Sequence, residues 1–476
     1  MHIGKADELS RRAFLRRSGH VAMMGGAASY ALGLAGMGEA AAFSAGTDYK
    51  ALVCVFLYGG SDHNSMLIPF DAANYARYAA IRGGTGEAGG GLTPARADLA
   101  ATALALPQGQ VLTNDITYAL ASTMPRLKAL YDARALAPVL NIGPLLAPMT
   151  RAQYDAQSVP RPPKLFSHND QQSTWQAYSP EGATVGAGGR IGDLAMSSNG
   201  NALFTCMSAT GNAVFLCGQR ALSYQISPGG AIAVNGVKSG VYGSRAAGDA
   251  LRSLLTQPHP HMLATDHAAI AKRSIEAEAF VTQALAPVNL ATSFKPASGS
   301  NSLASQLQVV ARVIAARGTM GVRRQVFMVS LGGFDTHDTQ VVNHGRLMGQ
   351  LDFALDAFYR ATVELGVADK VTTFTASDFG RTLASNGDGT DHGWGAHHLV
   401  MGGAVNGGRF YGVAPAIALN TPDQVGSGRL LPSVSVDQHM ATMGKWFGVS
   451  SAEMSAIAPN IGRFSASDLG FLAPAS

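Results

Sequence analysis

The chain has 476 residues, of which 47% are hydrophobic and 14% are charged. Globular domains contain about 25% charged residues, and disordered chains combine low hydrophobicity with high net charge, so this composition excludes a mainly disordered protein. The net charge is +4, and no dense Lys/Arg run follows the N-terminus, which argues against a nucleic-acid-binding surface.

The N-terminus has the pattern of an export signal. Residues 10–16 read SRRAFLR, which fits the twin-arginine pattern; a mildly apolar segment follows over 21–37, and small residues at 40–42 offer a cleavage site. The alternative is a basic helix start before a buried helix. We expect a twin-arginine signal peptide over 1–42, read by the twin-arginine translocase. The mature protein, 43–476, is then periplasmic or secreted and has no stable membrane span.

Continuous apolar runs predict an α/β protein with buried parallel strands. Residues 51–58 are apolar and end at two glycines, as in a strand buried on both faces. Similar runs predict strands at 137–142, 325–331, 371–376 and 399–401. Helical spacing predicts helices at 122–134, 249–257, 265–284, 302–317 and 347–358. The strand, helix, strand order over 325–376 is typical of a parallel crossover unit.

The middle of the chain has a different composition. Residues 180–245 are rich in Gly, Ser and Ala with short alternating stretches, which predicts small strands and loops in an inserted region of about 180–300. Cys54 lies in the first apolar run and is interpreted as a buried small hydrophobe. Cys206 and Cys217 are close enough in sequence to form a disulfide in an oxidising compartment, and the sequence leaves their pairing open.

A polar cluster follows each of several apolar runs. Because ligands of open α/β sheets bind beyond the carboxyl ends of the strands, these clusters could meet at one edge of the sheet. The first cluster, GGSDHNS at 59–65, offers Asp62 as an oxygen ligand; the alternative is a cap of the next turn. The second, LFSHNDQQ at 165–172, places Ser167 at a helix start, as a cap or as a nucleophile activated by metal.

The third cluster, LGGFDTH at 331–337, can direct one Asp and one His to the same ion. The fourth, ASDFGRT at 376–382, leads into DHGWGAHH at 391–398. Buried carboxylates need a metal or another partner, and Asp/His sets suit zinc, manganese or iron, whereas oxygen-rich sets suit magnesium or calcium. The alternative is a structural polar network. Arg381 is expected to bind a phosphate or sulfate group, or to form a salt bridge with a carboxylate.

These clusters resemble an exported bacterial family, domain of unknown function 1501. The resemblance covers about residues 48–450 and is carried by segments 56–62, 165–172, 330–337, 377–382 and 386–395. That family is similar to the alkaline-phosphatase and sulfatase superfamily. The resemblance therefore implies a three-layer α/β sandwich with a mostly parallel central sheet and a metal site at the strand ends.

The resemblance also implies roles for individual residues. Asp62 matches the early Asp of the superfamily pattern, and Ser167 is the most plausible nucleophile position, with His168 beside it as a further catalytic residue. Asp335 and His337 resemble the next metal-binding pair at a shorter spacing.

The last part of the superfamily pattern is matched with one departure. Asp378 matches the Asp of an Asp-His pair, but Phe379 stands where His is expected. His392 or His397 is then the residue that supplies the missing ligand. Arg381 is the candidate for holding the substrate's oxygens.

Two functions from different classes follow. The first is an exported hydrolase of small anionic phosphate or sulfate esters, in which a divalent metal (zinc, manganese, magnesium or calcium) activates Ser167 or water. The second is a non-catalytic exported binding or assembly module that retains the fold with a degenerate metal site; Phe379 favours it. A cofactor-bearing redox protein is suggested only by the export route.

Overall fold

The computed structural model describes residues 48–84 and 91–473. The expected signal peptide over 1–42 lies outside the described residues. Within them, no helix combines the length and the apolar character needed to cross a membrane.

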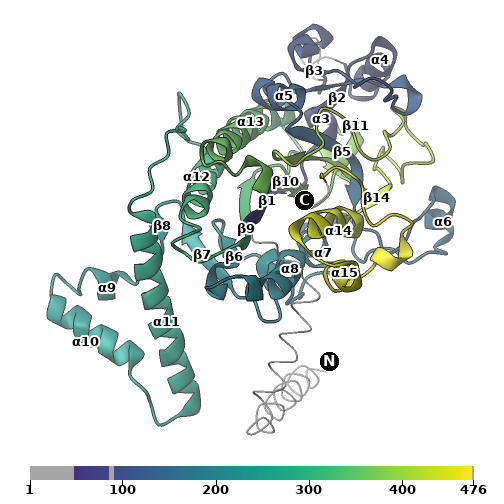
Figure 1. Ribbon diagram of the computed structural model, residues 1–476. Helices are drawn as coiled ribbons and strands as arrows, with labels where there is room; N and C mark the ends of the chain where they lie inside the picture. Colours follow the sequence, from purple (N-terminus) through teal and green to yellow (C-terminus); the bar gives the residue numbers. More distant parts are fainter. Residues whose placement is uncertain (1–47, 85–90, 474–476) are drawn as a thin grey trace.

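A nine-stranded sheet lies at the centre of the molecule, in the order β14-β5-β13-β10-β1-β9-β6-β7-β8 (Figure 1). β1 lies between β9 and β10 and is parallel to both. β13 is antiparallel to its two neighbours, and β8 is antiparallel to β7. The sheet is thus mostly parallel, as predicted. The strands span Lys50–Tyr58 (β1), Leu136–Gly143 (β5), Cys206–Ser208 (β6), Ser223–Ser227 (β7), Gly230–Ala231 (β8), Arg324–Gly332 (β9), Val371–Ser377 (β10), Ala396–Met401 (β13) and Val434–Ser435 (β14).

Helices cover both faces of this sheet and complete a three-layer α/β sandwich (Figure 1). Because successive side chains of a strand point to opposite faces, Val53 and Val55 enter one core while Cys54 and Phe56 enter the other. The first core is closed by α5 (Pro125–Asp132), α12 (Ser302–Ala315) and α13 (Gln340–Glu364). The second is closed by α7 (His168–Ala177), α8 (Ala187–Ala195), α14 (Val436–Phe447) and α15 (Met454–Ile457). This is the architecture that the resemblance implies.

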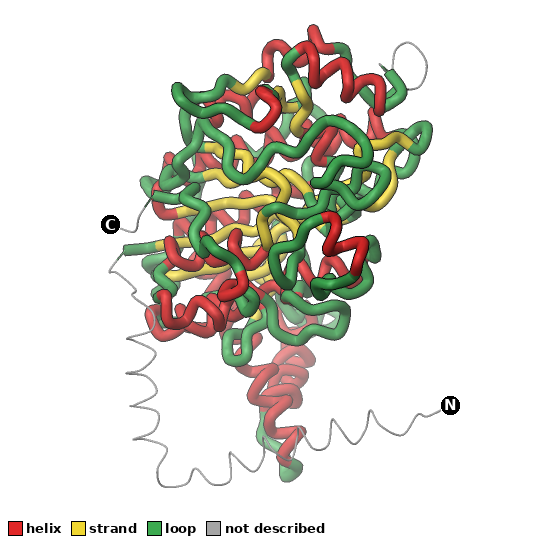
Figure 2. The backbone as a smooth tube through the Cα atoms, turned by 90° about the vertical axis from the view of Figure 1, so that its right-hand side faces the viewer, coloured by secondary structure: helices red, strands yellow, loops and turns green. Residues whose placement is uncertain are grey.

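The stretch expected as an insertion has two parts. β6, β7 and β8 extend the central sheet beyond β9. The helices α9 (Asn235–Lys238), α10 (Arg245–Thr256) and α11 (Met262–Leu285) form an arm that projects from the body (Figures 1 and 2). Cys206 and Cys217 are free, so the disulfide that the sequence left open is not formed.

Smaller elements surround the carboxyl ends of the central strands. β2 (Leu67–Pro69), β3 (Ala103–Leu104) and β4 (Tyr118–Leu120) form a three-stranded sheet. Near it lie α3 (His63–Met66) and α4 (Ala72–Ile81), and α6 (Arg151–Ala156) lies further along the chain. β11 (Arg381–Ser385) and β12 (Thr390–His392) form a hairpin directly after β10. This hairpin brings His392 back to the ends of β1 and β9.

Candidate metal centre

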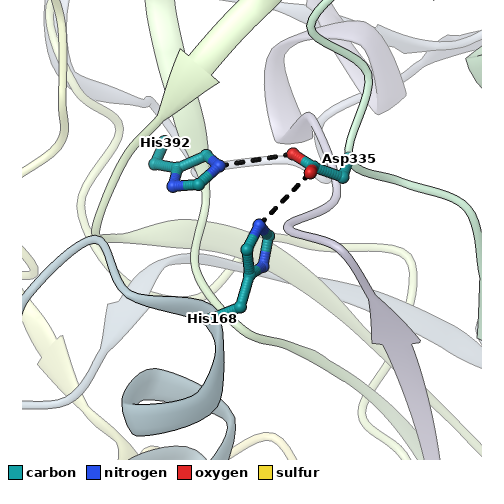
Figure 3. A group of neighbouring side chains, drawn as sticks. All are labelled: His168, Asp335 and His392. Atoms are coloured by element: carbon teal, nitrogen blue, oxygen red, sulfur yellow. Dashed lines mark hydrogen bonds and ion pairs between the residues drawn. The ribbon is translucent and has the colours of Figure 1, made fainter.

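Three side chains from distant parts of the chain meet at the ends of the central strands. His168 is the first residue of α7, Asp335 follows β9, and His392 is the last residue of β12. One ligand atom of each lies within 4.8 Å of the others. Figure 3 shows both imidazole rings facing the carboxylate of Asp335. The sequence predicts Asp335 and His392 as ligands and His168 as a catalytic residue, and the structure brings all three together.

His168 presents one nitrogen to this group and the other to a buried carboxylate. Its Nδ1 lies 2.7 Å from Asp378 Oδ2, and its Nε2 lies 3.4 Å from Asp335 Oδ2 without a hydrogen bond. The hydrogen bond to Asp378 raises the pKa of His168. With the proton of the neutral ring on Nδ1, the lone pair of Nε2 faces Asp335, as in carboxylate–histidine–metal arrangements.

Asp378 supports His168 and does not face the group itself. It is fully buried after β10, and its oxygens lie 3.2 Å from the backbone nitrogen of Gly59, 2.8 Å from Gln172 Nε2 and 2.7 Å from His168 Nδ1. Gly59 has a φ of 111°, and a Cβ there would lie 2.4 Å from the backbone nitrogen of Asp335, so this close turn requires glycine. Asp378, expected from the sequence to bind metal directly, is thus placed to orient a ligand.

His392 is oriented in a similar way. Its Nδ1 lies 2.7 Å from the carbonyl oxygen of Phe166, so Nδ1 carries the proton and Nε2 is left with a lone pair. That Nε2 lies 3.3 Å from Asp335 Oδ1 and 3.0 Å from His337 Nε2. Burial lowers the pKa of His392, which favours the neutral ring that a metal requires. His337 Nε2 itself lies 3.1 Å from Asp335 Oδ1.

Arg381 holds Asp335 from the protein side. Its Nη1 donates to Asp335 Oδ1 at 2.9 Å and to the carbonyl oxygen of Gly59 at 3.0 Å. Its Nε and Nη2 donate to the hydroxyl and the carbonyl oxygen of Thr390. Burial alone would raise the pKa of Asp335, but the hydrogen bond and charge of Arg381 hold it below its usual range. Arg381 therefore forms the salt bridge named as the alternative from the sequence, and its donors point at protein acceptors rather than at a substrate.

Asp62 is kept apart from the group by a different cation. It caps α3, is fully buried and accepts two hydrogen bonds from the Arg82 guanidinium, at 2.6 and 3.0 Å. Burial would raise the pKa of Asp62, but the Arg82 charge holds it well below its usual range. The capping role, the alternative from the sequence, is the one observed.

Two further candidates have hydrogen-bond partners other than Asp335. Ser167 precedes α7, and its Oγ donates to Asp170 Oδ2 at 2.9 Å. His397 is buried in β13, where its Nδ1 accepts from the backbone nitrogen of Asn141 at 3.1 Å and its ring packs against that of His63. Burial lowers the pKa of His397 well below its usual value, so the ring is neutral. Neither side chain is part of the group around Asp335.

Sequence reasoning missed the partners that hold these residues. Arg82 and Gln340 both bind Asp62, and Gln172 binds Asp378. Gln172 lies in the LFSHNDQQ segment, one helical turn after His168, so its spacing was a usable signal. Arg82 and Gln340 carry no such signal, because they reach Asp62 only through the tertiary fold.

The donor set fits a transition-metal ion. Two lone-pair-bearing Nε2 atoms and one carboxylate converge, and His337 Nε2 lies beside them. Imidazole and carboxylate together suit zinc, manganese or iron. The support of each ring by a carboxylate or a backbone carbonyl is the arrangement found behind metal-binding histidines. The residues present therefore fit a metal ion. Such an ion would compete with Arg381 for Asp335 Oδ1, which accepts a hydrogen bond from the guanidinium.

Residues 224–457 match the family described as "Protein of unknown function (DUF1501)". This stretch belongs to the DUF1501 family. The DUF1501 region contains Asp335, Asp378 and His392, whereas His168 lies outside it. Among curated proteins, none matches the chain.

Several solved structures resemble the chain at low sequence identity. The lipoteichoic acid synthase LtaP from Listeria monocytogenes is 11% identical, with 87% of this chain and 75% of that chain covered and a TM-score of 0.33. The C-terminal periplasmic domain of EcEptC from Escherichia coli, in complex with Zn, is 9% identical, with 88% of each chain covered and a TM-score of 0.32. A Bacteroides thetaiotaomicron structure from work on glycosaminoglycan metabolism is 10% identical, with coverage of 85% and 74% and a TM-score of 0.33.

Proposed function

We propose that this protein is an exported, metal-dependent hydrolase of phosphate or sulfate esters. The observation that supports metal dependence is the convergence of His168 and His392 on the carboxylate of Asp335. Export rests on the twin-arginine pattern at residues 10–16. The ester class rests on the similarity of the DUF1501 family to the alkaline-phosphatase and sulfatase superfamily, which the sequence segments imply.

In this proposal His168, Asp335 and His392 hold the ion. A divalent ion at this position would polarise an ester oxygen and lower the pKa of a nearby water. Asp378 and the carbonyl oxygen of Phe166 keep the two imidazoles in the required tautomer. The chain thus supplies a site in which the ligands are oriented before an ion arrives.

The open side of the site carries groups that can move a proton. The side chains of His337 and Asp391 are 44% and 51% exposed, and His337 Nδ1 lies 3.4 Å from Asp391 Oδ1. A histidine beside a carboxylate can serve as a general acid or base toward a bound substrate. A bound ion would supply its own activated water, whereas Ser167 Oγ donates its hydrogen bond to Asp170 and not to a ligand of the ion. We therefore assign the attack on the ester to water rather than to Ser167.

The proposal is tested by assaying phosphate and sulfate esters with the purified protein before and after chelation. We expect hydrolysis that disappears with the metal, returns with Zn²⁺ or Mn²⁺, and is absent from Asp335→Ala. Asp338→Ala is the matched control, since Asp338 is exposed three residues further along and lies outside the metal group. Failure of the metal-loaded protein to hydrolyse any ester would contradict the proposal.

A non-catalytic exported binding or assembly module is the second candidate. It is favoured by Phe379, whose ring lies 4.9 Å from that of His168, and by the bond of Ser167 to Asp170. In this case replacing an exposed residue in 180–245, such as Tyr242, impairs the phenotype that depends on the protein, whereas Asp335→Ala leaves that phenotype unchanged. Comparing the phenotypes of Tyr242→Ala and Asp335→Ala separates the two functions.

A further inference from the structure

We propose that the centre binds a single metal ion and that the Arg82 guanidinium takes the place of a second ion at Asp62. The inference rests on the proposed metal dependence and concerns the number of ions. It follows from how the three carboxylates near the strand ends are used: Asp335 faces the histidines, while Asp62 and Asp378 are occupied by other donors.

Asp62 has no lone pair left for an ion. Arg82 Nη1 and Nη2 donate to its two oxygens, and the other donors are Ser65 Oγ at 2.6 Å, Gln340 Nε2 at 2.6 Å and the backbone nitrogen of Asn64 at 3.2 Å. A carboxylate offers about four lone-pair directions, and these five contacts fill them. Arg82 is also fully buried, so the pair is closed to solvent.

The Asp62–Arg82 pair is connected to the metal group by hydrogen bonds. Gln340 donates to Asp62 through Nε2 and accepts from the Thr390 hydroxyl through Oε1 at 2.6 Å. Thr390 in turn accepts from Arg381 Nε at 2.9 Å, and Arg381 donates to Asp335. Arg82 is therefore linked to Asp335 through a chain of five hydrogen bonds. Its charge is permanent, since a guanidinium stays protonated in proteins.

An aromatic ring packs against both histidines. The Phe379 ring lies 4.9 Å from the ring of His168 and 4.6 Å from that of His392, and it is fully buried. It supplies no ligand atom, although it stands where the resemblance leads one to expect a histidine. Over residues 48–84 and 91–473, the group around Asp335 is the one set of His, Cys, Asp or Glu side chains placed to hold an ion.

The number of ions is measured by saturating the metal-free wild type with Mn²⁺, removing excess, and combining elemental analysis with electron paramagnetic resonance. We expect one ion per chain and the spectrum of an isolated Mn²⁺. Two ions per chain, or a spectrum of two coupled ions, would overturn the inference and leave the proposed function standing. No bound ion would overturn both.

A pair of variants identifies the carboxylate that binds the ion. Asp62→Asn is expected to retain one Mn²⁺ per chain, whereas Asp335→Asn loses it. Loss of the ion from folded Asp62→Asn, with circular dichroism like that of the wild type, would overturn the inference. Should Asp62→Asn fail to fold, the ion count of the wild type still decides the question.

Discussion

The Nδ1 atom of His168 lies 2.7 Å from Asp378 Oδ2, and this contact decides which nitrogen of His168 faces Asp335. The carboxylate is itself held by Gly59, at the end of β1, and by Gln172, on α7. The first ligand of the proposed centre is therefore positioned jointly by the central sheet and by its own helix.

Asp378→Asn is predicted to weaken metal binding about 10- to 100-fold, the usual effect of removing such a supporting group. The variant loses the charge that stabilises the Nδ1 proton of His168. Titration of metal-free protein with Zn²⁺ measures the change. Asp391→Asn is the control. Asp391 is half-exposed, and the histidine that it contacts is His337, which is not one of the proposed ligands. An unchanged affinity in Asp378→Asn would contradict the role assigned to Asp378.

Ser167→Ala is predicted to keep ester hydrolysis within about tenfold of the wild type, because water activated by the ion is the nucleophile in the proposed function. His168→Ala is the comparison and should lose at least about 100-fold, since it removes a ligand. The measurement is kcat/KM for the best ester found. A loss in Ser167→Ala as large as that in His168→Ala would show that Ser167 attacks the substrate.

Arg82→Met is predicted to lower the free energy of unfolding by about 3–5 kcal/mol, because it leaves the Asp62 carboxylate buried without its cation. Urea unfolding measures the change. The double variant Asp62→Leu/Arg82→Met should recover part of the loss, since neither charge remains. Lys272→Met is the control: Lys272 pairs with Glu276 at the surface, and such pairs contribute about 1 kcal/mol or less. Equal losses in Arg82→Met and Lys272→Met would contradict this account.

The positions of the carboxylates could be predicted from the sequence, whereas their partners could not. Asp335 and Asp378 follow β9 and β10, and both strands are apolar runs, so the meeting of these residues at one sheet edge follows from the pattern. Arg82 follows α4 and has no sequence feature that directs it to Asp62. The choice between metal ligand and salt bridge depends on that tertiary contact, so the sequence left both roles open.

The arrangement of the strands was also predicted only in part. The long buried strands β1, β5, β9 and β10 lie where their apolar runs predict. The short strands β6, β7 and β8 have no such runs, and they join the sheet by pairing outward from β9. Pairing of this kind depends on which edge is free after the longer strands have packed.

Asp437 is predicted to make stability fall as the pH rises. It lies near the start of α14, where burial raises its pKa to about 6 despite hydrogen bonds from Asn460. The folded protein therefore holds a proton that the unfolded chain releases near pH 4. The stabilisation is complete below about pH 4 and is lost as the pH rises through about 6, a difference of about 3 kcal/mol.

Asp437→Asn removes this titration. It should exceed the wild type in free energy of unfolding at pH 8 and match it near pH 4, as measured by urea unfolding across that range. Asp468→Asn is the control, because its pH effect on stability has the opposite sign. Burial would raise the pKa of Asp468, but the hydrogen bond and charge of Lys445 lower it overall. Parallel pH profiles for Asp437→Asn and the wild type would show that Asp437 does not titrate as stated.

The central claim is that His168, Asp335 and His392 together bind a metal ion. Calorimetric titration of metal-free wild type and of Asp335→Asn with Zn²⁺ tests it most directly. The account predicts saturable binding of one ion by the wild type and none by Asp335→Asn, whereas equal binding by both proteins, or by neither, would contradict it.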